Sequence, residues 1–223
     1  MTDPVLAQVD RPVLDWAWLQ RNAGDILDRL IEHVYLTVLA VAIGFVVAFG
    51  LALLAIRNRA TYGPITGVAN ILYTIPSLAL FALLVPFTRL SVLTAEIALV
   101  SYTLLIIIRN LVAGVDSVPA PVKEAADGMG YTPTRRFWKI EVPLALPVIL
   151  AGVRIATVTT VGLVTVSAII GLGGLGFFIL RGLQTFFWTP ILVGTIGSAL
   201  LAVAFDTVFV WLERHFTPWI RRS

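Results

Sequence analysis

The chain has 223 residues, of which 58% are hydrophobic and 13% are charged, and its mean hydropathy is +0.93. Soluble domains carry roughly 25% charged residues, so this composition excludes an ordinary soluble domain and places most of the chain in a bilayer. The net charge of +3 does not indicate a nucleic-acid partner, and the absence of cysteine excludes disulfides and thiolate metal sites.

Residues 1–29 form a polar segment before the first apolar stretch. The segment holds five Asp and three Arg residues and has no apolar run like that of a signal peptide. Trp16 and Trp18 suit the membrane–water boundary, where amphipathic rings collect. We expect an extracytoplasmic segment with an interfacial helix, and a frayed tail is the alternative.

Five apolar stretches are long enough to cross a bilayer, which takes about 20 residues. They are Val34–Ile56, Ile65–Phe87, Val92–Ile108, Pro147–Ile170 and Pro190–Leu212. The third carries Glu96 near its outer end, where we expect the carboxylate to reach water. The pattern predicts an all-α membrane protein with about five transmembrane helices, a transmembrane domain over residues 30–213 and a cytoplasmic tail over residues 214–223.

The second stretch contains the run Y-T-I-P-S-L-A-L-F, which begins at Tyr73. Pro76 removes a backbone hydrogen bond and kinks a helix. Membrane helices tolerate such a kink where other helices or a cavity satisfy the freed groups. Pro76 and Ser77 are therefore candidates for lining a translocation pathway, and a simple packing kink is the alternative.

The longest charged run between apolar segments covers Lys123–Pro143 and must lie in water. If it lies inside, ten Lys and Arg residues are cytoplasmic, five are outside and Arg154 lies within a span, in agreement with the positive-inside rule. The cytoplasmic set is Arg57, Arg59, Arg109, Lys123, Arg135, Arg136, Lys139, Arg214, Arg221 and Arg222, and the outer set is Arg11, Arg21, Arg29, Arg89 and Arg181. Five spans then leave the N-terminus outside and the C-terminus in the cytoplasm.

This charged run predicts two short helices joined at a sharp angle. Asp116 or Ser117 caps the first helix, and Gly130 closes it in the left-handed conformation. Thr132-Pro133 provides the cap and first turn of the second helix, which carries residues 135–139. The small residues at this elbow allow the backbone of another protein to approach closely.

The same run carries a spaced motif: Glu124-Ala125-Ala126, then Gly130 after three intervening residues, then Ile140-x-Val142-Pro143 after nine more. It resembles the EAA loop of ABC-importer permeases, with Val142 where Leu is commoner. In that family the loop is a coupling helix that docks into a cytoplasmic ATPase, and the resemblance implies a type I ABC-importer permease fold with a coupling loop over residues 111–143. The implied ATPase-coupling residues are Glu124, Ala125, Ala126, Gly130, Ile140 and Pro143. The alternative is a polar interhelical loop with an ordinary cap.

Gly171–Gly176 reads G-L-G-G-L-G and ends the fourth stretch. Glycine costs roughly 1 kcal/mol per helical position relative to alanine, so a break is expected at the outer membrane face. Gly173 and Gly174 are therefore further pathway candidates. The run follows a membrane helix and not a strand, and the chain has no GxxxxGK[ST] sequence. We expect this chain to bind no cofactor, so that any ATP is hydrolysed by a partner.

The T-I-P-S-L-A-L-F run and the glycine run, with the aromatic segment 177–188 behind it, resemble osmoprotectant permeases, which move glycine betaine, carnitine or choline. The resemblance implies a multi-pass plasma-membrane transporter subunit, not an enzyme, surrounded by lipid. Its implied partners are a second permease chain of the same or a similar kind, a cytoplasmic ATPase dimer and an extracytoplasmic solute-binding protein. Tyr73 and Tyr102 could bind a quaternary ammonium by cation–π contact, or could simply be core residues. The alternative substrate within the family is an amino acid such as methionine.

Functions of other classes have little support in the residues. An intramembrane enzyme needs paired carboxylates or a nucleophile with a base, and the spans offer only Glu96 and Asp206 as acidic candidates. His33 is expected at the interface and His215 in the cytoplasmic tail, so the two histidines cannot share a metal. We predict no catalytic and no metal site. A pure scaffold gives no reason for a coupling loop.

Two opposite charges are predicted at the same depth in the membrane. Arg154 lies seven residues after Pro147, and Asp206 lies seven residues before Glu213, so both are about 10 Å inside the inner boundary. Charges at such depth are costly and usually pair or face a cavity. We predict an ion pair that braces the fourth and fifth spans; separate extension of each side chain toward the surface is the alternative.

Overall fold

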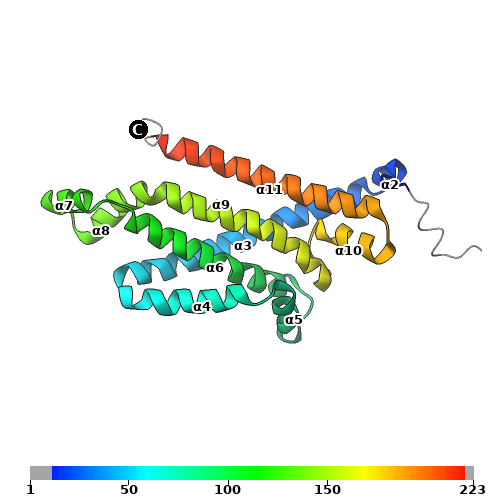
Figure 1. Ribbon diagram of the computed structural model, residues 1–223, viewed down its shortest axis with the longest axis horizontal. Helices are drawn as coiled ribbons and strands as arrows, with labels where there is room; N and C mark the ends of the chain where they lie inside the picture. The colour runs from blue at the N-terminus through cyan, green and yellow to red at the C-terminus, as the bar shows by residue number, and fades with distance from the viewer. Residues whose placement is uncertain (1–11, 219–223) are drawn as a thin grey trace, which may run out of the picture. The chain divides into compact units, whose positions relative to one another are not determined.

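Helices are the only regular secondary structure in residues 12–218, which are the residues that the computed structural model of the chain describes. Figure 1 shows their order along the chain. The chain folds as two compact units, and several long helices contribute residues to both. Unit 1 contains Met1–Ala40, Ile75–Val100 and Val158–Ala204, and unit 2 contains Val41–Thr74, Ser101–Thr157 and Phe205–Ser223.

Four helical segments of the described chain are long and apolar enough to cross a membrane. They are α3 (Ala23–Arg57), α6 (Val92–Asp116), the segment Pro133–Ile170, and α11 (Trp188–Phe216). The second predicted span is instead divided into α4 (Tyr62–Thr74) and α5 (Ser77–Thr88). Pro76 has an extended backbone, with φ −56° and ψ 131°, and has no N–H, so one regular helix cannot run through it. If this broken pair crosses as one span, the described residues supply five by length and composition.

The remaining elements are short or continue these segments. They are α2 (Trp16–Arg21), the 3₁₀ turn η1 (Arg59–Thr61), α7 (Ala120–Gly128), α8 (Pro133–Arg136), the π-helical turn η2 (Phe137–Glu141), α9 (Val142–Val166), the 3₁₀ turn η3 (Ser167–Ile170) and α10 (Gly176–Thr185). Because α8, η2, α9 and η3 follow one another without a break, the helical segment that contains the fourth predicted span begins at Pro133, well before Pro147, where the sequence places the entry of the span.

The N-terminal helix α2 is fixed by local and tertiary contacts in unit 1. The Asp15 carboxylate accepts a hydrogen bond from the Trp18 N–H at 2.9 Å and so caps the helix. The Trp18 ring packs edge-on against Phe178 and Phe187, with centroid distances of 5.8 and 6.0 Å. These contacts exclude a frayed tail over residues 15–21, whereas the placement of α2 at the membrane interface stays a prediction. Residues 1–11 of this segment lie outside the described part.

Large apolar side chains form the core of unit 1. Leu36, Phe81, Leu99 and Phe178 are all fully buried. They come from α3, α5, α6 and α10. The core therefore joins the start of α3 to the segment that follows the glycine run.

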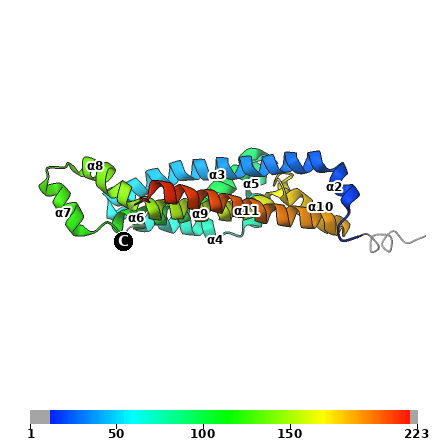
Figure 2. The same cartoon turned by 90° about the horizontal axis from the view of Figure 1, so that it is seen from above.

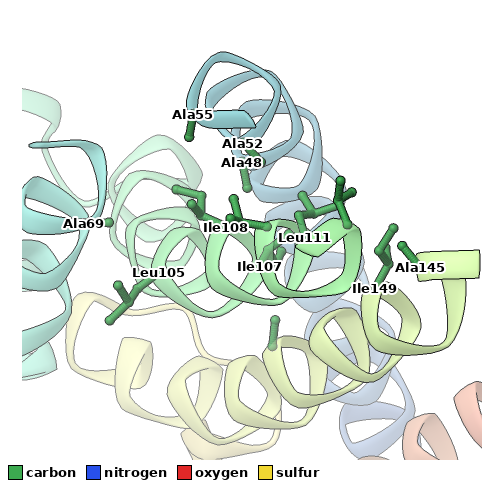
Figure 3. Close-up of a cluster of buried hydrophobic side chains, with 13 residues drawn as sticks. Ala48, Ala52, Ala55, Ala69, Leu105, Ile107, Ile108, Leu111, Ala145 and Ile149 are labelled. Atoms are coloured by element: carbon green, nitrogen blue, oxygen red, sulfur yellow. The ribbon is translucent and has the colours of Figure 1, made fainter. Parts of the chain in front are cut away.

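The core of unit 2 depends on small residues in α3. Ala48, Ala52 and Ala55 are at most 1% exposed, and Figure 3 shows them beside Ile108 and Leu111 of α6. Alanine on this face lets two helix backbones approach closely, which is how helices associate in a solvent as apolar as their side chains. The end of α3 is thereby held against α6, the helix that leads into the polar loop.

Candidate coupling loop and intramembrane sites

The first helix of the loop, α7, begins differently from the prediction. Asp116 and Ser117 do not cap it, because both serve the end of α6. The Asp116 carboxylate pairs with the Arg59 guanidinium, with Nη1 to Oδ2 at 2.9 Å, and the Ser117 hydroxyl donates to the Gly114 carbonyl at 2.7 Å. Pro119 occupies the cap position without a side-chain hydrogen bond, and its φ of −59° already suits a helical turn.

The elbow after α7 has the predicted conformation. Gly130 has φ +80°, and its N–H donates to the Asp127 carbonyl at 2.9 Å. A Cβ at Gly130 would meet no atom within 4 Å, so the backbone conformation and not the available space requires glycine. Thr132 then caps α8 by accepting a hydrogen bond from the Arg135 N–H at 3.3 Å, also as predicted. Figure 2 shows α7 and α8 as separate helices joined by this bend.

The second half of the loop is not a separate short helix. α8 passes through the π-helical turn η2 directly into α9. Ile140 lies in this turn and Pro143 lies in the first turn of α9. Pro143 has no N–H to offer the Lys139 carbonyl, so the ordinary α-helical bond is missing where the turn widens. The elbow is therefore continuous with a membrane-spanning helix.

Arg136 connects the two arms of the elbow. Its Nη1 contacts Asp127 Oδ2 of α7 at 2.5 Å, and its Nε donates to Glu141 Oε1 of η2 at 2.8 Å. Glu141 is only 5% exposed. The sequence analysis did not single out this triad, because its spacing of nine and five residues follows no regular helical period. An arginine pair, Arg135-Arg136, between two acidic residues in a helical elbow is the only signal the sequence offers.

The residues of the EAA-type motif divide into an inner and an outer face. Ala126 is 1% exposed, whereas Glu124 and Ala125 are exposed, and the Glu124 carboxylate has no hydrogen bond or ion pair with any described residue. Met129, the C-cap residue of this helix, is 66% exposed. The Lys123 ammonium donates to the Val115 carbonyl at 3.1 Å and holds the start of α7 to α6. α7 is therefore anchored at its base while an apolar face with small side chains stays accessible, as a docking surface requires.

The six candidate pathway residues are divided between the units. In unit 2, the Tyr73 and Tyr102 rings meet edge to face with centroids 5.9 Å apart, and Tyr73 is 38% exposed while Tyr102 is 5% exposed. The other four candidates belong to unit 1: Pro76 and Ser77 open α5, and Gly173 and Gly174 lie in the glycine run. The two tyrosines form one aromatic contact, and the other four residues are not part of it.

The glycine run breaks the helix as predicted. Gly171, Gly173 and Gly174 have φ of +85°, +106° and +50°. A Cβ on Gly173 would overlap the Ala168 backbone, and one on Gly174 would lie 2.7 Å from the His33 Cα. Here both the conformation and the lack of space require glycine.

His33 is a buried hub of unit 1 and not the interfacial residue that the sequence predicts. The side chain is fully buried, its Nε2 lies 3.0 Å from the Val161 carbonyl, and its Nδ1 accepts from the Leu175 N–H at 3.3 Å. These partners assign a neutral ring with the proton on Nε2. Leu175 follows the glycine break, so His33 satisfies a backbone group that the break leaves without a helical partner.

Glu96 does not reach water, contrary to the prediction. Its side chain is 6% exposed, and neither carboxylate oxygen has a hydrogen-bond partner among the described residues. The neighbouring Ala95, Ala98 and Leu99 are fully buried, so this face of α6 packs inward and carries Glu96 with it. In residues 12–218, no group of three or more His, Cys, Asp or Glu side chains is arranged to hold a metal ion.

Arg154 of α9 and Asp206 of α11 are in contact in unit 2. The Arg154 Nε lies 2.5 Å from Asp206 Oδ1, and Nη2 lies 2.8 Å from Oδ2. Both side chains are about one-third exposed in the single chain, at 35% and 38%. The pairing is parallel and two-point, the strongest arrangement for a guanidinium and a carboxylate.

Known proteins are similar to this chain in sequence and in fold. Residues 22–222 match the family model described as "Binding-protein-dependent transport system inner membrane component". The chain is 36% identical over 201 residues to the choline transport system permease protein OpuBB of Bacillus subtilis (strain 168), covering 90% of this chain and 93% of that one. It is 35% identical over 201 residues, with the same coverage, to the glycine betaine/carnitine/choline transport system permease protein OpuCB of the same organism. A solved chain of the inward-facing MetNI methionine ABC transporter matches with a TM-score of 0.76 at 24% identity, covering 86% of this chain and 96% of that chain.

Proposed function

Because the chain belongs to the family of binding-protein-dependent transport system inner membrane components, we propose that it forms the translocation pathway for a quaternary-ammonium osmoprotectant and couples to an ATPase through the α7–α8 elbow. Membership of this family establishes the general function of the chain. The chain is the membrane permease subunit of an ABC importer, it has the permease fold, and a separate subunit hydrolyses ATP.

The coupling proposal rests on the contacts that hold α7 in place. Its outer face is accessible at Ala125 and Met129, while Lys123 and the Arg136–Asp127 contact hold its two ends. Arg136 also binds Glu141 at the base of α9, so a displacement of α7 reaches a spanning helix through two short ionic contacts. A rigid path from a docking face to a membrane helix is what alternating access driven by a cytoplasmic ATPase needs.

The proposed orientation places the N-terminus outside and the elbow in the cytoplasm, supported by the distribution of Lys and Arg. Two permease chains, identical or similar, would enclose the pathway, with an ATPase dimer below and a solute-binding protein above. This chain itself would bind no nucleotide. ATP binding would close the ATPase dimer, move the two elbows and open the permease pair toward the binding protein.

The substrate proposal rests on the solutes that the relatives are named for and on one aromatic contact. The two relatives at 35–36% identity are named for choline, glycine betaine and carnitine transport. Quaternary ammonium groups bind well to aromatic faces, and the Tyr73–Tyr102 pair is one contact within the predicted spans that brings two aromatic rings together. The methionine-transporter likeness falls below 25% identity and supports the fold alone.

The test is uptake by the complete complex. The permease, its ATPase and its binding protein would be reconstituted in proteoliposomes, and ATP-driven uptake of labelled choline, glycine betaine and carnitine would be compared with that of methionine. The proposal predicts uptake of at least one quaternary ammonium and none of methionine. Methionine uptake with no uptake of the three ammonium compounds would contradict the proposed substrate. It would not affect the assignment of the chain as a permease subunit.

A further inference from the structure

A cavity of about 320 Å³ lies in unit 2 beside the elbow, and residues from two parts of the chain line it. One part is apolar and comes from the last turns of α3, with Leu53 and Ile56. The other part comes from α8 and η2 and carries the polar groups of Thr134, Arg136 and Glu141 beside the apolar side chains of Pro133, Phe137 and Trp138. Arg57, the last residue of α3, also lines the cavity.

The cavity is positioned at a membrane boundary by its own residues. The apolar run of α3 ends at Ile56 and is followed by Arg57-Asn58-Arg59. Trp138 also lines the cavity, is 49% exposed, and packs on Phe49 of α3 with ring centroids 5.9 Å apart. Tryptophan collects where hydrocarbon meets water. The apolar lining is therefore on the lipid side of the boundary and the polar lining is on the aqueous side.

The charges that line the cavity leave one cation uncompensated. Arg136 is neutralised by Asp127 and Glu141. Neither the Arg57 guanidinium nor the Thr134 hydroxyl has a hydrogen-bond or ionic partner among the described residues. The one carboxylate in the lining, that of Glu141, is already bound to Arg136. The cavity thus offers free donors and a net positive charge, which suits an anionic oxygen-rich group.

We propose that this cavity binds an anionic phospholipid, with the phosphate at Arg57 and Thr134 and an acyl chain along Leu53 and Ile56. An amphiphile satisfies both halves of the lining, whereas an acidic side chain from an aqueous protein would leave the apolar half empty. Anionic lipids are also concentrated in the cytoplasmic leaflet, where the Lys and Arg distribution places Arg57. Because the cavity includes Arg136, the lipid would contact the same residue that joins the arms of the elbow.

The experiment is lipid binding to the purified full-length chain by native mass spectrometry, with phosphatidylglycerol and phosphatidylcholine titrated separately. Arg57→Gln should weaken phosphatidylglycerol binding about fivefold, the effect of one cationic side chain at an anionic membrane surface. Binding of phosphatidylcholine should not change. Arg109→Gln is the matched control, since Arg109 is an exposed arginine of α6 without a described partner and outside the cavity lining. It should bind both lipids as the native chain does.

Two further variants keep the test decisive if Arg57→Gln folds poorly. Arg57→Lys should retain phosphatidylglycerol binding because the charge remains, and Thr134→Val should weaken it. Native-like phosphatidylglycerol binding by both Arg57→Gln and Thr134→Val would overturn the proposal. Displacement of the lipid by millimolar inorganic phosphate would show a site for a small anion instead. Loss of the ATPase subunit from the Arg57→Gln complex with unchanged lipid binding would show a protein-docking pocket, and it would also contradict the proposal.

Discussion

Arg154 and Asp206 form a two-point ion pair between α9 and α11, 52 residues apart in the chain. Each side chain is about one-third exposed in the isolated chain, at a depth where the sequence predicts hydrocarbon. A charge pair at such depth that is not fully covered by its own chain must face a water-filled cavity or another protein chain. We expect the pair to be structural and to brace the helix that leaves the elbow.

A double-mutant cycle tests this bracing role. Arg154→Ala and Asp206→Ala should each lower the unfolding temperature in detergent by a few degrees, because each leaves its partner unpaired. The double variant should be no less stable than either single variant. Thermal unfolding of the four proteins supplies the cycle. Losses that simply add would show that the two residues act independently.

Gly130→Val should uncouple transport without preventing membrane insertion. The substitution places a β-branched residue at φ +80°, which costs about 1–2 kcal/mol and tilts α7 against α8. Gly67→Val is the matched control, because Gly67 also has open space at its Cβ but lies inside helix α4, outside the elbow, and has no positive φ. ATP-driven uptake in proteoliposomes should be lost in the first variant and kept in the second. Equal transport by both variants would refute a role for the elbow's conformation.

Arg136→Gln should separate ATP hydrolysis from uptake. It removes both ionic contacts of the elbow and leaves the Glu141 carboxylate, 5% exposed, without its cation. Arg135→Gln is the control, since Arg135 lies over the Tyr131 ring and has no ion pair among the described residues. The ratio of substrate moved to ATP hydrolysed should fall for Arg136→Gln only. The double variant Arg136→Gln/Glu141→Gln should recover part of the stability lost in Arg136→Gln, because position 141 then carries no buried charge.

His33→Leu should destabilise the protein by about 1–3 kcal/mol, the cost of leaving a buried polar group unsatisfied. The groups concerned are the Val161 carbonyl and the Leu175 N–H. Tyr35→Leu, at a 54% exposed position of the same helix, should have little effect. Thermal unfolding in detergent measures both. A His33→Leu protein as stable as the native one would mean that the glycine break does not depend on this histidine.

Features set by neighbouring residues could be predicted from the sequence. The left-handed Gly130, the Thr132 cap and the break at the glycine run each depend on a few consecutive residues and on backbone sterics. Apolar length likewise predicted the long helices. Pro76 predicted a kink, whereas the helix is fully interrupted there, and the extension of α9 through Pro143 was missed, because a π-helical turn tolerates the missing N–H.

Features that depend on partners far away in the chain were predicted poorly. His33 and Glu96 were placed at the surface because each lies near the end of an apolar run, yet tertiary packing buries both. The Arg136 triad was missed since its spacing has no period. The Arg154–Asp206 contact could be predicted although the two residues are far apart in the chain. Counting residues along each helix gives the depth of each side chain in the membrane, and the two depths are the same.

Cross-linking at Ala125 tests most directly the claim that the elbow docks on an ATPase. The chain has no cysteine, so a single introduced thiol reacts at one known position. Ala125→Cys places it on the exposed face of α7, and Leu183→Cys places it at a 57% exposed position of α10, on the opposite side of the membrane in the proposed orientation. In the assembled complex, a short thiol–amine cross-linker should join the Ala125→Cys chain to the ATPase and should leave the Leu183→Cys chain unjoined. No product at Ala125→Cys, or equal products from both variants, would contradict the account.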